Sequence, residues 1–142
     1  MTQLHFQPIQ DKTLDILETI LRTEEVASVG DALGILSVVI EELVVNIVNY
    51  AHSDYLDVEI IRDEKNIALR FHDNGIPFNP LQKDPPDITS PLEDRKIGGL
   101  GIFMVKKFMD TVSYEYTEGE NVLMVEICGS LSAYFFKVRV RA

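Results

Sequence analysis

The sequence predicts an α+β fold in which helices pack on one face of a mixed, mostly antiparallel sheet. Two observations carry this prediction: short segments in which apolar and polar residues alternate, and longer apolar segments with helical spacing. Short polar turns join the alternating segments in pairs, as in antiparallel hairpins. The 142 residues are enough for one domain with a substantial core.

Five alternating segments are expected to form strands. They are residues 3–8, 55–61, 67–71, 112–117 and 122–127. The first segment ends at Pro8, which suits an edge strand. Polar turns at 62–66 and 118–121 link the other four segments into two hairpins.

Three segments are expected to form helices, over residues 12–26, 32–51 and 98–109. Asp11 and Asp31 are expected to cap the first two helices, because a side-chain oxygen before a helix can accept a backbone N–H. The central helix is apolar around most of its circumference, which predicts that it is buried.

A polar stripe interrupts the apolar surface of the central helix. Glu42, Asn46 and Asn49 follow one another at spacings of four and three, so they lie within roughly 60° of one another on a helical wheel. Buried polar groups need partners. The stripe therefore either bonds to backbone or faces water, or it faces a hydrated ligand. In the latter case Asn offers a neutral oxygen to magnesium, and Glu can accept a proton from a nucleophile.

A turn is expected directly after the third strand. Residues 72–80 contain Asp73, Gly75 and Pro77, in which glycine frees the backbone and proline stiffens the exit. The same pattern fits a plain turn. Residues 81–97 follow as a long loop with three prolines and no helical or strand period, and such loops are usually lids or disordered.

Glycines open the third expected helix. Gly98, Gly99 and Gly101 would let a ligand approach backbone N–H groups, where the helix dipole favours anions. A flexible hinge would also explain these glycines. The segment is neither a P-loop, because no Gly-Lys-Ser/Thr follows, nor a dinucleotide fingerprint, because its spacing differs and no strand directly precedes it.

Composition and charge exclude several function classes. The formal net charge of −10 disfavours nucleic acid, and it would repel a free nucleotide unless backbone amides and a divalent cation neutralise the phosphates. No apolar stretch is long enough to span a membrane, and the first residues lack a signal-peptide pattern. The single cysteine, Cys128, excludes an internal disulfide and suits a reducing cytoplasm.

The final segment, residues 129–142, differs in charge from the rest of the chain. It contains three basic residues and no acid, and Lys137, Arg139 and Arg141 alternate with apolar residues. The other residues carry 10 basic and 23 acidic side chains, a net charge of −13. We expect one domain over residues 1–128 and a basic tail that forms an extra strand, crosses to a second subunit or is disordered.

Four features lie in a fixed order along the chain. They are Glu42-x-x-x-Asn46 on a buried helix, Asp73-x-Gly75-x-Pro77 after a strand, a long loop, and Gly98-Gly99-x-Gly101 at a helix start. The ordered set resembles the ATP-binding domain of the GHKL superfamily, which groups gyrase, Hsp90, histidine kinases and MutL. Residues 97–110, Tyr114 and Gly119-x-Asn121-x-Leu123 are most similar to the small anti-sigma-factor serine kinases. The resemblance covers about residues 3–127 and implies the Bergerat ATP-binding fold, a two-layer α/β sandwich.

The resemblance implies roles for the matching residues. Glu42 would be the catalytic base, Asn46 would ligate magnesium, and Asp73 would accept a hydrogen bond from the adenine amino group. Residues 81–97 would form a lid. The other implied nucleotide-binding residues are Asn49, Gly75, Pro77, Gly98, Gly99, Leu100, Gly101 and Asn121.

The resemblance implies an ATP-binding anti-sigma-factor-type protein serine/threonine kinase with ATP and Mg²⁺ as cofactors. The expected partners are a sigma factor, which the protein would sequester, and a small anti-anti-sigma (STAS-type) protein, which it would phosphorylate. We expect a cytoplasmic protein without nucleic-acid or membrane partners. The edge strand at 3–8 is compatible with a homodimer.

Two alternatives remain open. Family kinases can carry an arginine early in the first helix, whereas here Lys12 is the only candidate, with Arg22 two turns further on. A nucleotide-gated protein-binding module without phosphotransfer is therefore one alternative. The other is a histidine-kinase-like catalytic domain acting in trans, although His5, His52 and His72 all lie outside the context of a phosphoacceptor histidine.

Overall fold

The computed structural model describes residues 1–82 and 100–128 of the chain. The described elements follow one another as strand, helices, hairpin, helix and hairpin. In chain order they are β1 (Thr2–Phe6), α1 (Thr13–Leu21), α2 (Glu24–Ala27), η1 (Gly30–Ala32), α3 (Leu33–Tyr50), β2 (Leu56–Arg62), β3 (Asn66–Asp73), η2 (Pro80–Gln82), α4 (Leu100–Phe108), β4 (Thr111–Thr117) and β5 (Glu120–Cys128).

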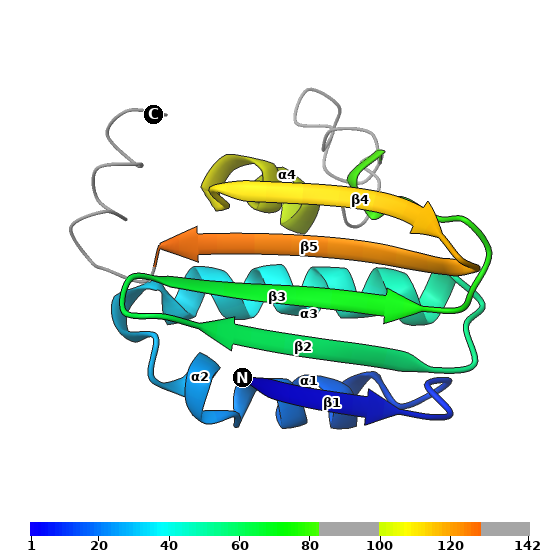
Figure 1. The fold of residues 1–142 in the computed structure, drawn as a ribbon, viewed down its shortest axis with the longest axis horizontal. Coiled ribbons are helices and arrows are strands. Elements are labelled where there is room, and N and C mark those ends of the chain that lie inside the picture. Colours follow the sequence, from blue (N-terminus) through cyan, green and yellow to red (C-terminus); the bar gives the residue numbers. More distant parts are fainter. Residues whose placement is uncertain (83–99, 129–142) are drawn as a thin grey trace, which may run out of the picture.

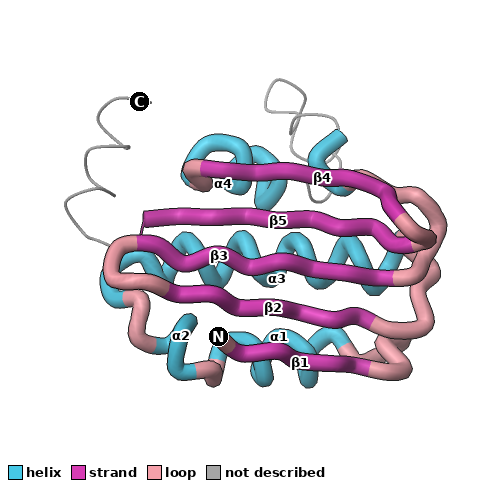
Figure 2. Tube along the Cα trace, viewed as in Figure 1, coloured by secondary structure: helices cyan, strands magenta, loops and turns pink. Residues whose placement is uncertain are grey.

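One five-stranded sheet organises the described chain, with strand order β1-β2-β3-β5-β4. The helices lie behind the sheet in Figure 1, and the strands form the front layer. Figure 2 shows the same two layers by type of secondary structure. The expected α+β sandwich with helices on one face is therefore confirmed. Each of the four pairings is antiparallel, so the described sheet contains no parallel pair.

The core lies between α3 and the helix-facing side of the sheet. The expectation that the central helix is buried is confirmed, because its apolar side chains Leu36, Leu43 and Val44 have no exposed surface. Alternate residues of the strands complete the core, since a strand points every second side chain to the same face. In β3 these residues are Ile67, Leu69, Phe71 and Asp73.

The first expected helix, residues 12–26, is divided into α1 and α2. The break follows from local hydrogen bonds: the Thr23 side chain and backbone N–H both donate to Ile20 O, at 2.7 and 3.2 Å. Thr23 has an extended backbone and precedes α2. A threonine hydroxyl can thus compete with the helical pattern of hydrogen bonds.

The two expected aspartate caps are wrong. Lys12 rather than Asp11 precedes α1, and Asp11 has a φ of 60°. Asp31 lies inside the 3-10 turn η1, and Ala32 precedes α3. No side-chain cap bond is made at either helix start, because the backbone enters each helix through a turn that precedes it.

The five expected strands are confirmed, and each end lies within two residues of its expected position. The tail at 129–142 and the loop residues 83–97 lie outside the described residues, so the expected domain boundary at residue 128 stays a prediction. Among the described residues no helix has the length and apolar character needed to cross a membrane.

Phe71 gives a test of the core. Its side chain is fully buried in the middle of the sheet, so Phe71→Ala should lower the free energy of unfolding by about 3–5 kcal/mol through lost burial and a cavity. Urea denaturation measures this change. Ile61→Ala, in the partly exposed end of β2, should change it by less than about 1 kcal/mol. Equal losses in the two variants would contradict the described core.

Candidate nucleotide site

Three parts of the chain meet beside the carboxyl-terminal half of α3. The turn after β3 contacts the end of α3, where the Ile76 N–H donates to Ala51 O at 2.8 Å. The start of α4 packs against the middle of α3 at Gly101 and Glu42. The fold thus brings three of the four expected sequence features together, namely the polar stripe, the Asp73 turn and the described part of the glycine segment.

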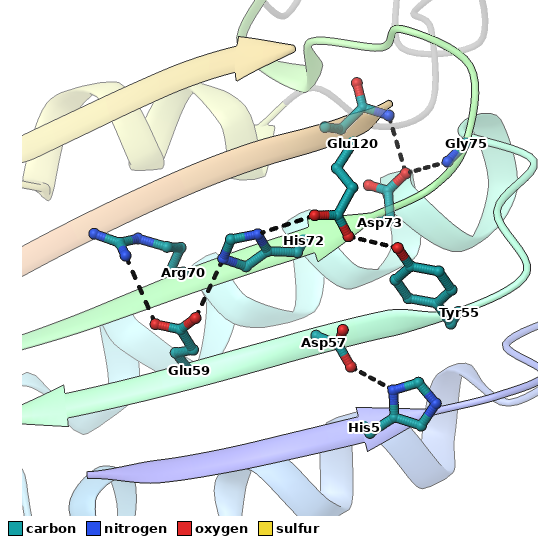
Figure 3. Close-up of polar contacts among 10 residues, drawn as sticks. His5, Tyr55, Asp57, Glu59, Arg70, His72, Asp73, Gly75 and Glu120 are labelled. Atoms are coloured by element: carbon teal, nitrogen blue, oxygen red, sulfur yellow. Dashed lines mark hydrogen bonds and ion pairs between the residues drawn. The ribbon is translucent and has the colours of Figure 1, made fainter. Parts of the chain in front are cut away.

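Asp73 is held at the end of β3 by a ring of donors. The residue is 2% exposed, and its Oδ1 accepts hydrogen bonds from the Ser53 hydroxyl at 2.6 Å, the Gly75 N–H at 2.9 Å and the Asn121 amide at 2.9 Å. Figure 3 shows Asp73 beside Gly75 at the end of its strand. Within the described residues Oδ2 has no hydrogen bond. One carboxylate oxygen is therefore occupied and the other can accept a donor from a ligand.

Gly75 is required by close packing. An added Cβ would lie 2.0 Å from Ala51 O and 2.5 Å from the Ser53 Oγ. Neither distance is sterically allowed, and the nearer atom belongs to backbone. The resemblance implied a nucleotide-binding role for Gly75. The contact that the structure adds is with the protein itself, between the turn and the end of α3.

Asn121 connects the parts of the turn. It is buried, and its Nδ2 donates to Asp73 Oδ1 at 2.9 Å and to Ile76 O at 2.8 Å. Its Oδ1 accepts from the Phe78 N–H at 2.8 Å and from the Tyr114 hydroxyl. An amide has two N–H donors and two acceptor lone pairs, so protein groups use all four. Asn121 therefore holds Asp73 and the turn in place.

The polar stripe of α3 has an unusual pattern of hydrogen bonds. Asn46 is 1% exposed, and its Nδ2 donates to Glu42 O at 2.7 Å and to Glu42 Oε1 at 3.0 Å. Its Oδ1 is buried and has no hydrogen-bond partner in the described part of the chain. Glu42 is half-buried, whereas Asn49 is exposed. An unsatisfied buried oxygen is costly unless a ligand completes it.

Asn46 Oδ1 is suited to be a ligand of magnesium. Magnesium prefers oxygen ligands and usually keeps several waters or substrate phosphates, so one neutral protein oxygen is a sufficient anchor. Residues 1–82 and 100–128 contain no cluster of three or more His, Cys, Asp or Glu residues that could hold a metal without such outside ligands. The single neutral oxygen of Asn46 suits a cation whose other ligands are waters or phosphates.

The remaining predicted site residues are distributed as follows. Gly98 and Gly99 lie outside the described residues, and Leu100 is the first residue of α4. Gly101 is buried, and a Cβ there would lie 2.4 Å from Glu42 Cβ. Pro77 is exposed in the turn next to Phe78. The Phe78 ring packs near Tyr50 of α3, with the ring centroids 5.8 Å apart.

A polar network covers part of the open face of the sheet (Figure 3). Glu59 lies 3.7 Å from Arg70 and 3.4 Å from His72, and His72 lies 3.8 Å from Glu120. The Tyr55 hydroxyl donates to Glu120 at 2.5 Å. This hydrogen bond, with burial and nearby carboxylates, raises the pKa of Tyr55 to about 12.

His5 makes a separate pair on this face. Its Nδ1 contacts Asp57 Oδ1, and this hydrogen bond raises the pKa of His5 above its usual value. The sequence placed His5 in the expected strand at 3–8 and gave it no partner. Cross-strand pairing supplies the partner, because His5 lies directly opposite Asp57 in the β1–β2 register.

Two residues of the candidate site were missed by the sequence analysis as functional groups. Ser53 follows α3 in an irregular segment, and only the fold brings its hydroxyl to Asp73. Tyr114 belongs to the segment that resembles the family, but its role as the donor to Asn121 depends on the pairing of β4 with β5. Ser53 lies in no periodic pattern, and the alternation of residues 112–117 predicts a strand without showing the partner of Tyr114.

The Asn121 connections predict a stability change. Asn121→Ala removes the four hydrogen bonds and leaves buried partners unsatisfied, so the free energy of unfolding should fall by at least about 2 kcal/mol. Urea denaturation provides the measurement. Asn66→Ala is the matched control, since the Asn66 side chain makes no hydrogen bond within the described residues. A small change at residue 121 would show that these bonds contribute little.

The raised pKa of Tyr55 predicts a decline of stability in alkali. Between pH 10 and about 12 the folded protein keeps the phenol proton that the unfolded chain loses, so the free energy of unfolding falls as pH rises through this window. Denaturation at several pH values measures the slope. Tyr55→Phe and Glu120→Gln should each make the decline smaller, and an unchanged slope in both would contradict the assignment.

Comparison with known proteins identifies a family for most of the chain. Residues 11–127 match the model of the histidine kinase-like ATPase domain. The serine-protein kinase RsbW of Listeria monocytogenes is 31% identical over 104 residues, which span 68% of this chain and 66% of the relative. RsbW of Bacillus thuringiensis is 31% identical over 98 residues, spanning 64% of this chain and 61% of the relative.

The serine/threonine-protein kinase BtrW of Bordetella bronchiseptica is 29% identical over 87 residues, which span 58% of this chain and 61% of the relative. Each match thus spans slightly less than two thirds of the relative's length. The family match covers most of the described fold and every described site residue, from the stripe of α3 to Asn121. The chain therefore belongs to the histidine kinase-like ATPase family, the GHKL superfamily.

Proposed function

We propose that the protein is an ATP-dependent protein serine/threonine kinase of the anti-sigma type. The observation that carries the proposal is the buried Asn46, whose Oδ1 has no hydrogen-bond partner among residues 1–82 and 100–128, one helical turn from the Glu42 carboxylate. This pair combines a cation ligand with a proton acceptor. The relatives named serine-protein kinase support the same activity class.

Each end of the nucleotide has a proposed partner. Asp73 Oδ2 accepts a hydrogen bond from the amino group of adenine, while Ser53, Gly75 and Asn121 hold the other carboxylate oxygen. Asn46 Oδ1 ligates magnesium, and the cation when bound supplies the positive charge that neutralises the phosphates. The backbone N–H groups of Gly99 and Gly101 are the proposed phosphate donors, as the helix start favours anions.

In phosphotransfer, Glu42 is the proposed general base. The serine hydroxyl of the substrate protein forms a bond to the terminal phosphorus while the bond to the bridging oxygen breaks and ADP leaves. Glu42 accepts the hydroxyl proton, which a carboxylate can do when it lies within hydrogen-bond reach. We further propose a STAS-type anti-anti-sigma protein as substrate, a sigma factor as the sequestered partner and a cytoplasmic location, with a homodimer compatible with edge strand β1.

A nucleotide-gated binding module is the second candidate. The observation that favours it is the lack of arginine early in the first helix. Lys12 is the only basic residue there, and Arg22 lies after α1, where it pairs with Glu18 at 3.8 Å on the surface. Such a module would capture its partner only with ATP bound and would still do so after Glu42→Gln.

Nucleotide binding is tested by titration with ATP, with and without magnesium. Wild-type protein should bind magnesium-ATP, while Asp73→Asn and Asn46→Ala should each weaken binding by about tenfold or more, or 1.4 kcal/mol. Asp31→Asn, at an exposed position in η1, is the matched control and should bind like wild type. Absence of binding to wild-type protein would contradict both candidate functions.

Transfer is tested with labelled ATP and a STAS-type protein that contains a serine acceptor. Glu42→Gln should lower the rate of transfer by about 100-fold or more, because it removes the proposed general base. Binding of magnesium-ATP should persist in this variant. Transfer at the wild-type rate would exclude Glu42 as the base, and binding without any transfer by wild-type protein would favour the gated module.

A further inference from the structure

The described glycines differ in the atoms that an added Cβ would meet. A Cβ added to Gly30, Gly34 or Gly119 would meet no atom within 4 Å. At Gly75 the close neighbour is the backbone of Ala51. At Gly101, by contrast, a Cβ would lie 2.4 Å from both Cβ and Cγ of Glu42 and 2.6 Å from its Cδ. The backbone of α4 therefore rests directly on the side chain of the proposed base.

Glu42 is restrained at both ends. Gly101 contacts the aliphatic part of the side chain, and Asn46 Nδ2 donates to the carboxylate at 3.0 Å. A side chain that is free at its stem would exchange rotamers. With α4 against the stem and Asn46 at the head, the carboxylate is held beside Asn46 Oδ1, which has no hydrogen-bond partner in the part of the chain that the structure describes.

We infer that Gly101 is a positioning residue for Glu42, an inference that rests on the proposed function. Its lack of a side chain allows α4 to approach α3 closely enough to set the rotamer of the base. A methyl group at residue 101 would have to move from 2.4 to at least 3.0 Å from Glu42, and would push either the carboxylate or the helix out of place. Displacements of this size reduce proton-transfer rates strongly, because catalysis depends on near-attack geometry.

The kinetic test compares Gly101→Ala with Gly34→Ala. Gly34 also lies in the first turn of a helix but has open space around it. Gly101→Ala should lower the rate constant of phosphotransfer at saturating magnesium-ATP by about 10- to 100-fold. Saturation separates this rate from any change in affinity, because the N–H of residue 101 is also a proposed phosphate donor. Gly34→Ala should change neither the rate nor the affinity. An unchanged rate constant at saturating magnesium-ATP would overturn the inference.

A double-mutant cycle isolates the effect on the base. In a Glu42→Gln background the proposed base is already absent, so Gly101→Ala should cause little further loss of rate. An undiminished further loss would show that Gly101 acts elsewhere. The same cycle with Glu42→Gly removes the Cβ, Cγ and Cδ atoms that the added methyl meets.

Thermal unfolding is the readout for that second cycle, so it remains informative even if Gly101→Ala is poorly folded. Gly101→Ala should lower the melting temperature of the wild type much more than that of Glu42→Gly. Equal decreases would overturn the inference, since the contact would then not be with Glu42.

A final readout does not depend on catalysis. The side-chain amide resonance of Asn46 in a ¹H–¹⁵N NMR spectrum reports its hydrogen bond to Glu42, and it should shift in Gly101→Ala but not in Gly34→Ala. An unmoved resonance would overturn the positioning role. If this resonance shifts while wild-type protein transfers no phosphate, the proposed kinase function fails and the positioning of Glu42 by Gly101 stands.

Discussion

The structure depends on the packing of one long helix, α3, against an antiparallel sheet. Burial of apolar side chains on both sides of this interface is the main stabilising term available to a domain of this size. The same burial makes any polar group on α3 costly unless it is satisfied. Asn46 meets this constraint with its amide N–H groups, whereas its oxygen has no partner among the described residues, so the core itself creates the conditions for a ligand site.

Close backbone approach is the second determinant of the site. Gly75 brings the turn after β3 against the end of α3, and Gly101 brings α4 against its middle. Both contacts exclude a Cβ, yet they act on different partners. The first fixes the backbone around Asp73, and the second restrains the side chain of Glu42. Rigid elements that hold polar groups at set distances are what preorganised catalysis requires.

Hydrogen-bond saturation separates the residues that hold the site from those that can bind a ligand. Every donor and acceptor of the Asn121 amide is bonded to a protein group. The Oδ1 of Asp73 likewise accepts all of its hydrogen bonds from protein groups. Within the described residues, Asn46 Oδ1 is buried without a hydrogen-bond partner, and the hydrogen bonds of the Asp73 carboxylate all go to its Oδ1. This division suits an acidic protein, because the groups left for a ligand are few, and the phosphates of a nucleotide would be neutralised by a cation and backbone dipoles.

The sequence by itself determined the strands, the buried central helix and the order of the site segments, because these follow from periodicity within short windows. It also placed Glu42 and Asn46 on one face of α3, since their spacing is a property of the helix. Only the tertiary structure decided the roles of Ser53, Tyr114 and Asn121, whose hydrogen bonds join residues far apart in the chain or on neighbouring strands. The contacts of Gly75 and Gly101 were equally beyond sequence reasoning, because a glycine shows that a side chain is absent without showing which atoms take its place. The helix caps failed for a related reason: the backbone conformation before α1 and α3 depends on how the chain packs as it enters each helix, and an aspartate at the right spacing does not determine it.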